Sequence, residues 1–191
     1  MRIIVGISGA SGAILGCSIL KALRAHKEVE THLIITDAAK LTLSCETALT
    51  AEEAAALADY SYDVNDTAAR VASGSFETDG MIIAPCSMKT LSGIANGYDE
   101  NLLIRAADAT LKEGRKLVLA PRESPLARSH LRNMLRAAED GAVILPPMLT
   151  FYHDEQDVKH QIDHFTGKAL MQFHLKFENF RAWDGPEARA K

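Results

Sequence analysis

The chain has 191 residues, of which 47% are hydrophobic and 24% charged, and its formal net charge at pH 7 is -4. This length fits a single domain with one core, and the composition excludes an intrinsically disordered chain. Because the net charge is negative and the basic residues are scattered, we expect no nucleic-acid partner. No apolar run approaches the ~20 residues that cross a bilayer, and the first residues show no signal-peptide pattern, so we expect a cytoplasmic protein without a membrane partner.

Short apolar strands alternate with helical segments along most of the chain. This alternation predicts strands at Arg2–Ile7, Thr31–Ile35, Met81–Ala84, Lys116–Ala120 and Ala142–Leu145. It predicts helices at about Ser11–Arg24, Leu91–Gly97, Leu102–Glu113, Pro125–Asp140 and from Asp157 to about Phe177. Strands separated by helices of this length indicate an α/β fold with a parallel sheet.

Two stretches fit the alternation less well. Thr50–Phe76 begins as an Ala-rich helical segment and continues as a polar stretch, which could reach over a site. The C-terminal end has a loose pattern, and the role of Trp183 is open. We expect one domain over residues 1–175 and a tail over residues 176–191.

The potential metal ligands do not form a convincing metal site. The three cysteines, Cys17, Cys45 and Cys86, are odd in number and widely spaced, which favours reduced thiols and gives Cys86 a packing role. His160 and His164 have the i,i+4 spacing of metal ligands, but their polar neighbours favour a solvated helix face. We therefore expect no metal.

A loop of small residues, Val5–Ala13 (VGISGASGA), follows the first strand and opens a helix. The unpaired N–H groups at a helix start favour an anion, and the hydroxyls of Ser8 and Ser11 add donors. Close packing of helix on strand would also explain the small residues. The glycine spacing is not that of a dinucleotide-binding loop, and no Walker Lys follows.

Polar residues also follow three other strands. Ser87, Lys89 and Thr90 stand at a predicted helix start, and Arg122 follows a further strand. Ligands of open parallel sheets lie beyond the carboxyl ends of the strands, so these groups should meet at one edge. Thr36 could add a hydroxyl there, whereas Asp37 could bind a ribose and keeps a nicotinamide cofactor open.

A series of segments in this order resembles the UbiX-type flavin prenyltransferases over Met1 to about Phe173. The segments are GISGASGA, THLIITDAAK, SCET, SGSF, APCSMKTLSGIANGY, IRAADATLKEGRKLVLAPRESPL, HLRNML, GAVILPP and FYH. The resemblance implies a Rossmann-like, flavodoxin-related three-layer sandwich with a mostly parallel sheet. It also implies a homo-oligomer, a dodecamer, with flavin bound at subunit contacts.

The resemblance implies a transferase that needs no metal. Reduced FMN would react at N5 and C6 with dimethylallyl phosphate or diphosphate. The prenyl-FMN product would serve a separate UbiD-type decarboxylase of aromatic or hydroxyaromatic acids. A flavin-dependent decarboxylase of peptidyl cysteine and a non-enzymatic FMN-binding accessory subunit are the alternatives.

Site residues carry over by position. Flavin contacts would come from Gly9, Ala10, Ser11, Thr36, Ser87, Met88, Lys89, Thr90 and Arg122. Glu46 matches the carboxylate near the reacting nitrogen, and Glu46, Ser11 or the retained phosphate could be the base. The polar set near the prenyl phosphate would be Arg105, Lys112, Glu123, Tyr152 and Lys168, whose cations offset the developing charge.

Three positions depart from the usual family pattern. Lys168 stands where Arg is frequent, which replaces a bidentate fork by a point charge. Thr36 stands where Ser is common and keeps the hydroxyl. The stretch Asp66–Ala69 has no aromatic residue where some members carry a Trp, which bears on rate and donor preference.

Overall fold

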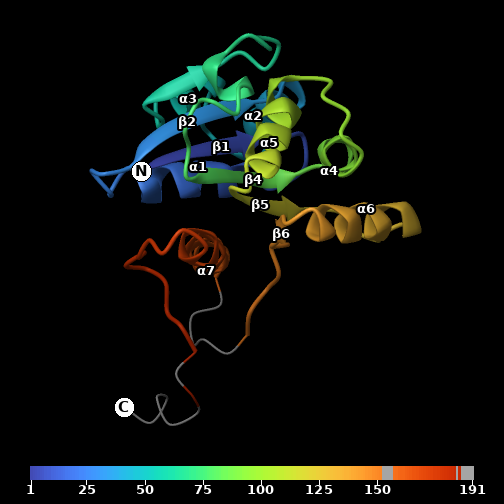
Figure 1. The fold of residues 1–191 in the computed structure, drawn as a ribbon. Helices are drawn as coiled ribbons and strands as arrows, with labels where there is room; N and C mark the ends of the chain where they lie inside the picture. Colours follow the sequence, from blue (N-terminus) through green and yellow to red (C-terminus); the bar gives the residue numbers. More distant parts are fainter. Residues whose placement is uncertain (152–156, 184, 186–191) are drawn as a thin grey trace.

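Six parallel strands form one sheet in the order β3-β2-β1-β4-β5-β6 within the described part of the chain (Figure 1). The computed structural model describes residues 1–151, 157–183 and 185. The strands are β1 (Arg2–Ile7), β2 (Glu30–Ile35), β3 (Tyr60–Tyr62), β4 (Gly80–Cys86), β5 (Lys116–Pro121) and β6 (Val143–Ile144). This strand order is that of a doubly wound, Rossmann-like α/β fold.

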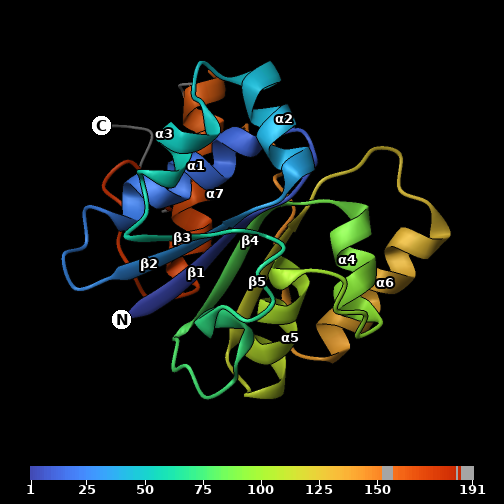
Figure 2. The same ribbon diagram turned by 90° about the horizontal axis from the view of Figure 1, so that it is seen from above.

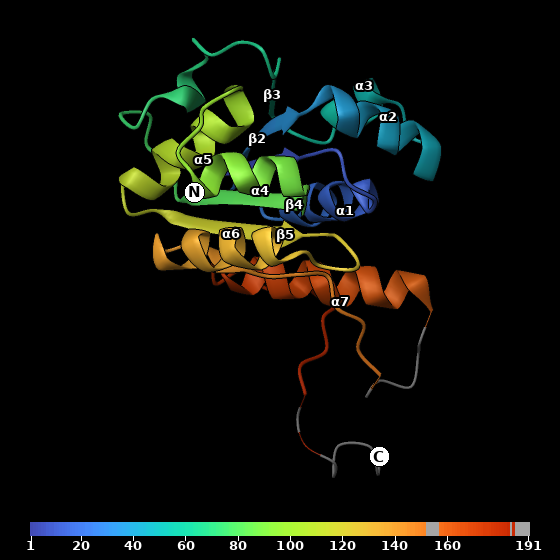
Figure 3. The same cartoon turned by 90° about the vertical axis from the view of Figure 1, so that its right-hand side faces the viewer.

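Helices cover both faces of the sheet (Figure 2). One face carries α1 (Ala13–Leu23), α2 (Asp37–Glu46), α3 (Ala51–Ala55) and α7 (Val158–Met171), and the other carries α4 (Met88–Ala95), α5 (Leu102–Lys112) and α6 (Arg128–Glu139). A single 3-10 turn, η1 (Arg70–Ala72), lies between β3 and β4. The result is three layers, and α1 and α7 pack against each other on one face of the sheet. Figure 3 shows the fold from the side, with α7 below β5.

The alternation of side chains along β1 explains why two cores form. Ile3, Val5 and Ile7 belong to the core with α1 and α7, whereas Ile4 belongs to the core with α5. Successive residues of a strand point to opposite faces, so a strand covered on both faces must be apolar throughout. This is why the central strands were recognisable as continuous apolar runs.

All five predicted strands are present, and β3 is the one that the sequence pattern missed. It has three residues, Tyr60–Tyr62, two of them exposed, and it pairs with β2 on one side at the sheet edge. A short half-exposed edge strand lacks the apolar run that identified the others. It falls within Thr50–Phe76, the stretch that fitted the alternation least.

The C-terminal helix corrects one prediction about its histidines. His164 is 8% exposed and its ring lies 5.3 Å from that of Phe180, so the expected solvated face is wrong for this residue. Phe180 also packs where a side chain at Gly167 would stand. No helix in the described ranges has the length and apolar character needed to cross a bilayer.

Gly16 allows α1 to approach the sheet closely, so a substitution at this position tests whether the free energy of unfolding rises or falls. A Cβ at Gly16 would stand 2.5 Å from the carbonyl oxygen of Ala84 in β4. Alanine favours a helix over glycine by about 1 kcal/mol. We nevertheless expect Gly16→Ala to lower the free energy of unfolding by about 1–3 kcal/mol, because α1 must move away from a backbone atom.

Urea denaturation at fixed protein concentration measures this effect. Gly93→Ala is the matched control, because its Cβ would meet the movable Cδ1 of Ile104, at 2.6 Å, and no strand backbone. A stabilised Gly16→Ala variant would contradict the packing described here.

Candidate active site

A cavity of about 680 Å³ opens at the carboxyl edge of the sheet. It lies where β1 and β4 are neighbours and where the chain continues into α1 on one face and into α4 on the other. Loops that leave a sheet in opposite directions leave a crevice between them. The lining residues are Gly9, Ala10, Ser11, Thr36, Asp37, Ala38, Val64, Asn65, Ser87, Met88, Lys89, Thr90, Glu100, Asn101, Ile104, Arg122 and Glu123.

The buried hydroxyl of Ser8 joins the loops that follow β1 and β4. Its Oγ donates to the carbonyl of Pro85 at 2.9 Å and accepts from the backbone N–H of Ser87 at 2.7 Å. The hydroxyl of Ser8 is therefore engaged with two backbone groups of the protein, and Ser8 does not line the cavity. The expectation that Ser8 offers a donor to a ligand is wrong, whereas Ser11 does line the cavity.

The carboxylate of Glu46 occupies the N-terminus of α1. Its Oε2 accepts from the N–H groups of Gly12, at 2.8 Å, and Ala13, at 3.1 Å. These are the donors that the sequence assigned to an anion, and the anion is a side chain of the same protein. Glu46 reaches them from the last turn of α2, beside the rim of the cavity at Ser11.

The surroundings of Glu46 keep it ionised. Burial, the largest influence, acts to raise its pKa, but hydrogen bonds from the Ser11 hydroxyl and from the N–H groups of Gly12 and Ala13, with the charge of Arg122, lower the pKa below its ordinary value. A carboxylate with this many donors is negatively charged at neutral pH. It can accept a proton from a substrate held at Ser11.

The N-termini of α2 and α4 face the same cavity. Thr36 accepts from the N–H of Ala39 at 3.2 Å and Ser87 accepts from that of Thr90 at 3.3 Å. Each neutral cap satisfies one donor of its first turn and leaves others for a ligand. These two helix starts are suited to a phosphate group.

Charged side chains surround the cavity mouth. Lys89 Nζ lies 3.1 Å from Glu100 Oε1, and Lys40 Nζ lies 2.8 Å from Asp37 Oδ1. Since Asp37 is paired with Lys40, its geometry gives no support to a ribose contact. Arg122 extends from the end of β5, where its backbone N–H donates to the carbonyl of Cys86 at 3.2 Å.

These residues fit a flavin mononucleotide. Hydroxyls, an ammonium and a guanidinium line the wall together with two unblocked helix starts, which is the donor set that a phosphate and flavin carbonyls need. Gly9 has no room for a side chain against Ala38, so the loop after β1 must stay small beside α2. The cavity volume is within the usual range for cofactor sites.

Three of the expected phosphate-binding cations lie away from this cavity in the same chain. Arg105 donates to Asp99 Oδ2 at 2.7 Å and to Asp108 Oδ2 at 3.4 Å, and neither Arg105 nor Lys112 lines the cavity. Lys112 ends α5, about 16 Å along the helix from its start at the cavity. Lys168 lies in α7 on the other face of the sheet, with its Nζ 5.9 Å from the Phe180 ring. Tyr152 lies outside the described residues.

Sequence reasoning missed one wall of the cavity. Val64 and Asn65 come from the chain between β3 and β4, and Asn101 and Ile104 come from the start of α5. None of them follows the carboxyl end of a recognised strand, which was the signal used for the other loops. The only hint was that the polar stretch after Thr50 could reach over a site.

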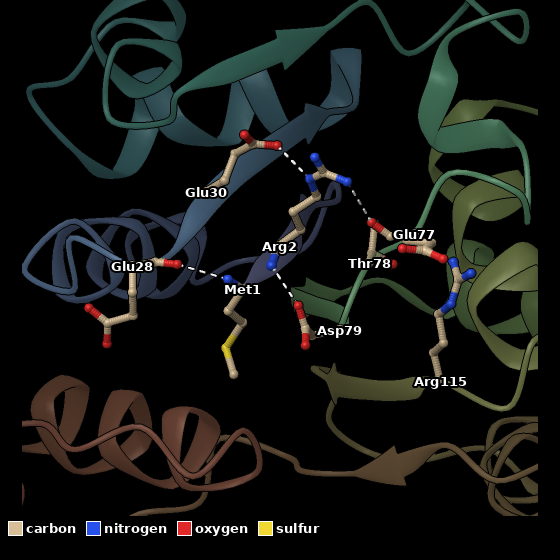
Figure 4. A pocket seen from close by; sticks show the side chains of 8 residues that line it. All are labelled: Met1, Arg2, Glu28, Glu30, Glu77, Thr78, Asp79 and Arg115. Atoms are coloured by element: carbon tan, nitrogen blue, oxygen red, sulfur yellow. Dashed lines mark hydrogen bonds and ion pairs between the residues drawn. The ribbon is translucent and has the colours of Figure 1, made fainter.

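A second hollow lies at the opposite, amino-terminal edge of the sheet (Figure 4). Its polar groups bind one another: Arg2 Nε lies 2.9 Å from Glu30, its backbone N–H donates to Asp79 at 2.6 Å, and the Met1 ammonium donates to the carbonyl of Glu28 at 2.8 Å. Ligands of parallel sheets bind at the other edge. We therefore assign the hollow to the tethering of β1, β2 and β4.

Two of the three cysteines are buried in the cores. Cys86 is inaccessible, burial raises its pKa to about 12, and burial also raises the pKa of Cys17 despite the charge of Lys21. The packing role expected for Cys86 is confirmed. Among the described residues, no group of three or more His, Cys, Asp or Glu side chains could hold a metal ion.

Comparison with known proteins identifies close relatives. A family model described as Flavoprotein matches residues 1–166. A probable UbiX-like flavin prenyltransferase from Sedimentibacter hydroxybenzoicus is 58% identical over 185 residues, covering 97% of this chain and 98% of that protein.

Solved structures agree with this similarity. A dodecameric FMN-dependent UbiX-like decarboxylase from Escherichia coli O157:H7 has 50% identity and a TM-score of 0.95, covering 97% of this chain and 100% of that chain. AnUbiX (PadA1), solved in complex with FMN and dimethylallyl pyrophosphate, has 47% identity and a TM-score of 0.94, covering 96% and 97%.

The lowered pKa of Glu46 predicts a pH-dependent contribution to stability. The contribution should be complete above the ordinary pKa of 4.5 and lost as the pH falls through the lower value of the folded protein. We expect Glu46→Gln to have a lower free energy of unfolding than wild type at pH 7, with the difference shrinking below pH 4.5.

Urea denaturation at about pH 3 and at about pH 7, on either side of the ordinary pKa of 4.5, checks this expectation. Glu139→Gln, at the exposed end of α6, is the control for loss of one surface charge. A Glu46→Gln difference that stays constant across the range would show that the carboxylate is not stabilised at the start of α1.

Proposed function

The chain belongs to the family of UbiX-like flavin prenyltransferases, and we propose that it joins a dimethylallyl group to N5 and C6 of reduced FMN. The donor is dimethylallyl phosphate or diphosphate. The observation that carries the proposal is the cavity between β1 and β4, which places the ionised Glu46 and Ser11 at one end and two open helix starts at the other. No metal takes part.

In this proposal, the phosphate of FMN binds at the N-termini of α2 and α4. Thr36, Ser87, Lys89 and Thr90 surround these helix ends. The start of α1 is unsuited to the phosphate, because Glu46 already holds its N–H groups and would repel a second anion. The ring then lies towards Ser11 and Arg122, against the small residues of the loop after β1.

The reaction breaks the allyl C–O bond, releases the phosphate and joins N5 to the carbon that carried it. C6 then bonds to the far carbon of the double bond, whose middle carbon gains a proton, while N5 and C6 each lose one. Phosphate leaves readily only if cations meet its developing charge, and Arg105, Lys112 and Lys168 supply them, with Tyr152 as a hydrogen-bond donor. Glu46 is ionised at neutral pH and accepts a proton directly or through Ser11. Glu123 belongs to the polar set around the same phosphate.

Neighbouring copies of the chain complete this site. Arg105, Lys112 and Lys168 do not reach the cavity of their own chain, so a single chain lacks the cations that the leaving phosphate requires. Exposed apolar side chains are available for such contacts, since Leu135 is 59% and Leu149 64% exposed. We place the chain in a homo-oligomer, a dodecamer like its Escherichia coli relative.

The product, a prenylated flavin, is itself a modified cofactor and can serve another enzyme. We propose that a UbiD-type decarboxylase of aromatic or hydroxyaromatic acids receives it. The flavin-binding domain spans residues 1–175 and acts in the cytoplasm.

The activity is tested by mass spectrometry of the flavin. We expect anaerobic incubation of the protein with reduced FMN and dimethylallyl phosphate to yield a flavin heavier by one five-carbon prenyl unit. Glu46→Gln should abolish this conversion and still bind FMN, because the carboxylate lies beside the cavity and not on its wall. Unmodified flavin with both phosphate donors would instead favour an FMN-binding accessory subunit.

The proposal that neighbouring copies complete each site is tested by mixing two inactive variants. We expect Glu46→Gln and Arg105→Ala each to be inactive as pure oligomers. In co-expressed mixed oligomers, about a quarter of the sites should combine an intact Glu46 with an intact Arg105 from another copy, if each site draws them from two symmetry-related chains. The measurement is the rate of prenyl-FMN formation, and a mixture as inactive as its parents would place both residues in one chain's site.

A further inference from the structure

One wall of the flavin cavity comes from the irregular chain between β3 and β4. Val64 is 4% exposed, and its carbonyl accepts from the N–H of Leu102 at 2.9 Å, which ties this chain to the start of α5. The next residue, Asn65, is fixed by its backbone N–H, which donates to Asp63 Oδ1 at 2.8 Å. Asn65 is therefore held at the cavity wall by the contact of Val64 with α5 and by its own backbone hydrogen bond to Asp63.

The rest of this connection is also held in place. Arg115 donates to the carbonyls of Gly74, at 2.7 Å, and Phe76, at 2.9 Å. The Arg70 guanidinium lies 4.7 Å from the centre of the Tyr60 ring. These contacts fasten a segment of little regular structure to β3 and to Arg115, the residue before β5, so it forms a stable wall.

The side-chain amide of Asn65 is available to a ligand. Among the described residues it makes no hydrogen bond, although its backbone does. Asn101 on the same wall differs, because its Oδ1 accepts from the N–H of Ile104 at 3.1 Å and caps α5. An exposed amide with two N–H groups is a neutral donor suited to an anion.

The two ends of the cavity indicate which part of the flavin Asn65 meets. Ser11 and Arg122 mark the end near Glu46, where N5 reacts on the proposed function. The ribityl chain leaves the central ring from N10, on the side opposite N5, so the phosphate lies away from Ser11. Lys89 and Thr36 line the cavity at the open helix starts. Asn65 follows β3, which pairs in parallel with β2, the strand that ends just before Thr36, so Asn65 lines the cavity on the side of Thr36.

We propose that the side-chain amide of Asn65 donates a hydrogen bond to the phosphate of FMN, which makes it a flavin-binding residue of this site. The inference rests on the proposed function for the presence of FMN. The contact comes from the chain between β3 and β4, which does not follow any of the strands predicted from the sequence. Of the carboxylates that line the cavity, Asp37 pairs with Lys40 and Glu100 with Lys89, and the nearby Asp63 accepts the backbone N–H of Asn65.

Riboflavin, which lacks the phosphate, provides the test. We expect Asn65→Ala to weaken FMN binding about tenfold, as expected for loss of a hydrogen bond to a charged group, and to leave riboflavin binding unchanged. Asn65→Asp should weaken FMN binding further, because its carboxylate repels the phosphate. Dissociation constants are measured by flavin fluorescence at fixed ionic strength, and riboflavin binding also reports that each variant is folded.

Thr67→Ala is the matched control, because Thr67 belongs to the same segment but does not line the cavity. Equal losses for FMN and riboflavin, or no loss for FMN, would overturn the phosphate contact. Failure of the wild type to bind FMN would instead overturn the proposed function. In the prenylation assay, Asn65→Ala should raise the KM for reduced FMN with little change in kcat.

Discussion

The adjacency of β1 and β4 is the constraint on which the rest of the site depends. Their following helices, α1 and α4, pack on opposite faces of the sheet, so neither can cover the gap between the two strand ends. The buried Ser8 hydroxyl bonds the two loops to each other and keeps the gap at a fixed width. If another pair of neighbouring strands had their following helices on opposite faces, the crevice would lie beside different residues.

Charge at the helix starts gives this crevice two unlike ends. The start of α1 is closed by the Glu46 carboxylate, whereas α2 and α4 are capped by the neutral hydroxyls of Thr36 and Ser87. A helix start already neutralised by a carboxylate no longer attracts an anion. On the proposed function, the phosphate of FMN binds at the end with the neutral caps, and the carboxylate lies beside the ring.

Much of this arrangement is predictable from local sequence, and the reason lies in the parallel sheet. Its buried strands are apolar runs, and the residues after each run stand at one edge, so Thr36, Ser87 and Arg122 could be placed together without a structure. Glu46 could be named only through a family resemblance, because its target lies at Gly12, in another segment. Asn65 could not be found, since it follows a three-residue edge strand with no apolar run.

The cations expected at the leaving phosphate differ from the flavin-binding residues, because they do not line the cavity of their own chain. Arg105 and Lys112 lie seven residues apart on α5, two helical turns, and therefore share one face of that helix. In its own chain Arg105 is paired with Asp99, and neither Arg105 nor Lys112 lines the cavity. A helix face with two cations suits a phosphate presented by another copy, where it can exchange its internal carboxylate partner for a ligand. Flavin binding on this view needs the loops of one chain, whereas loss of phosphate needs the assembly.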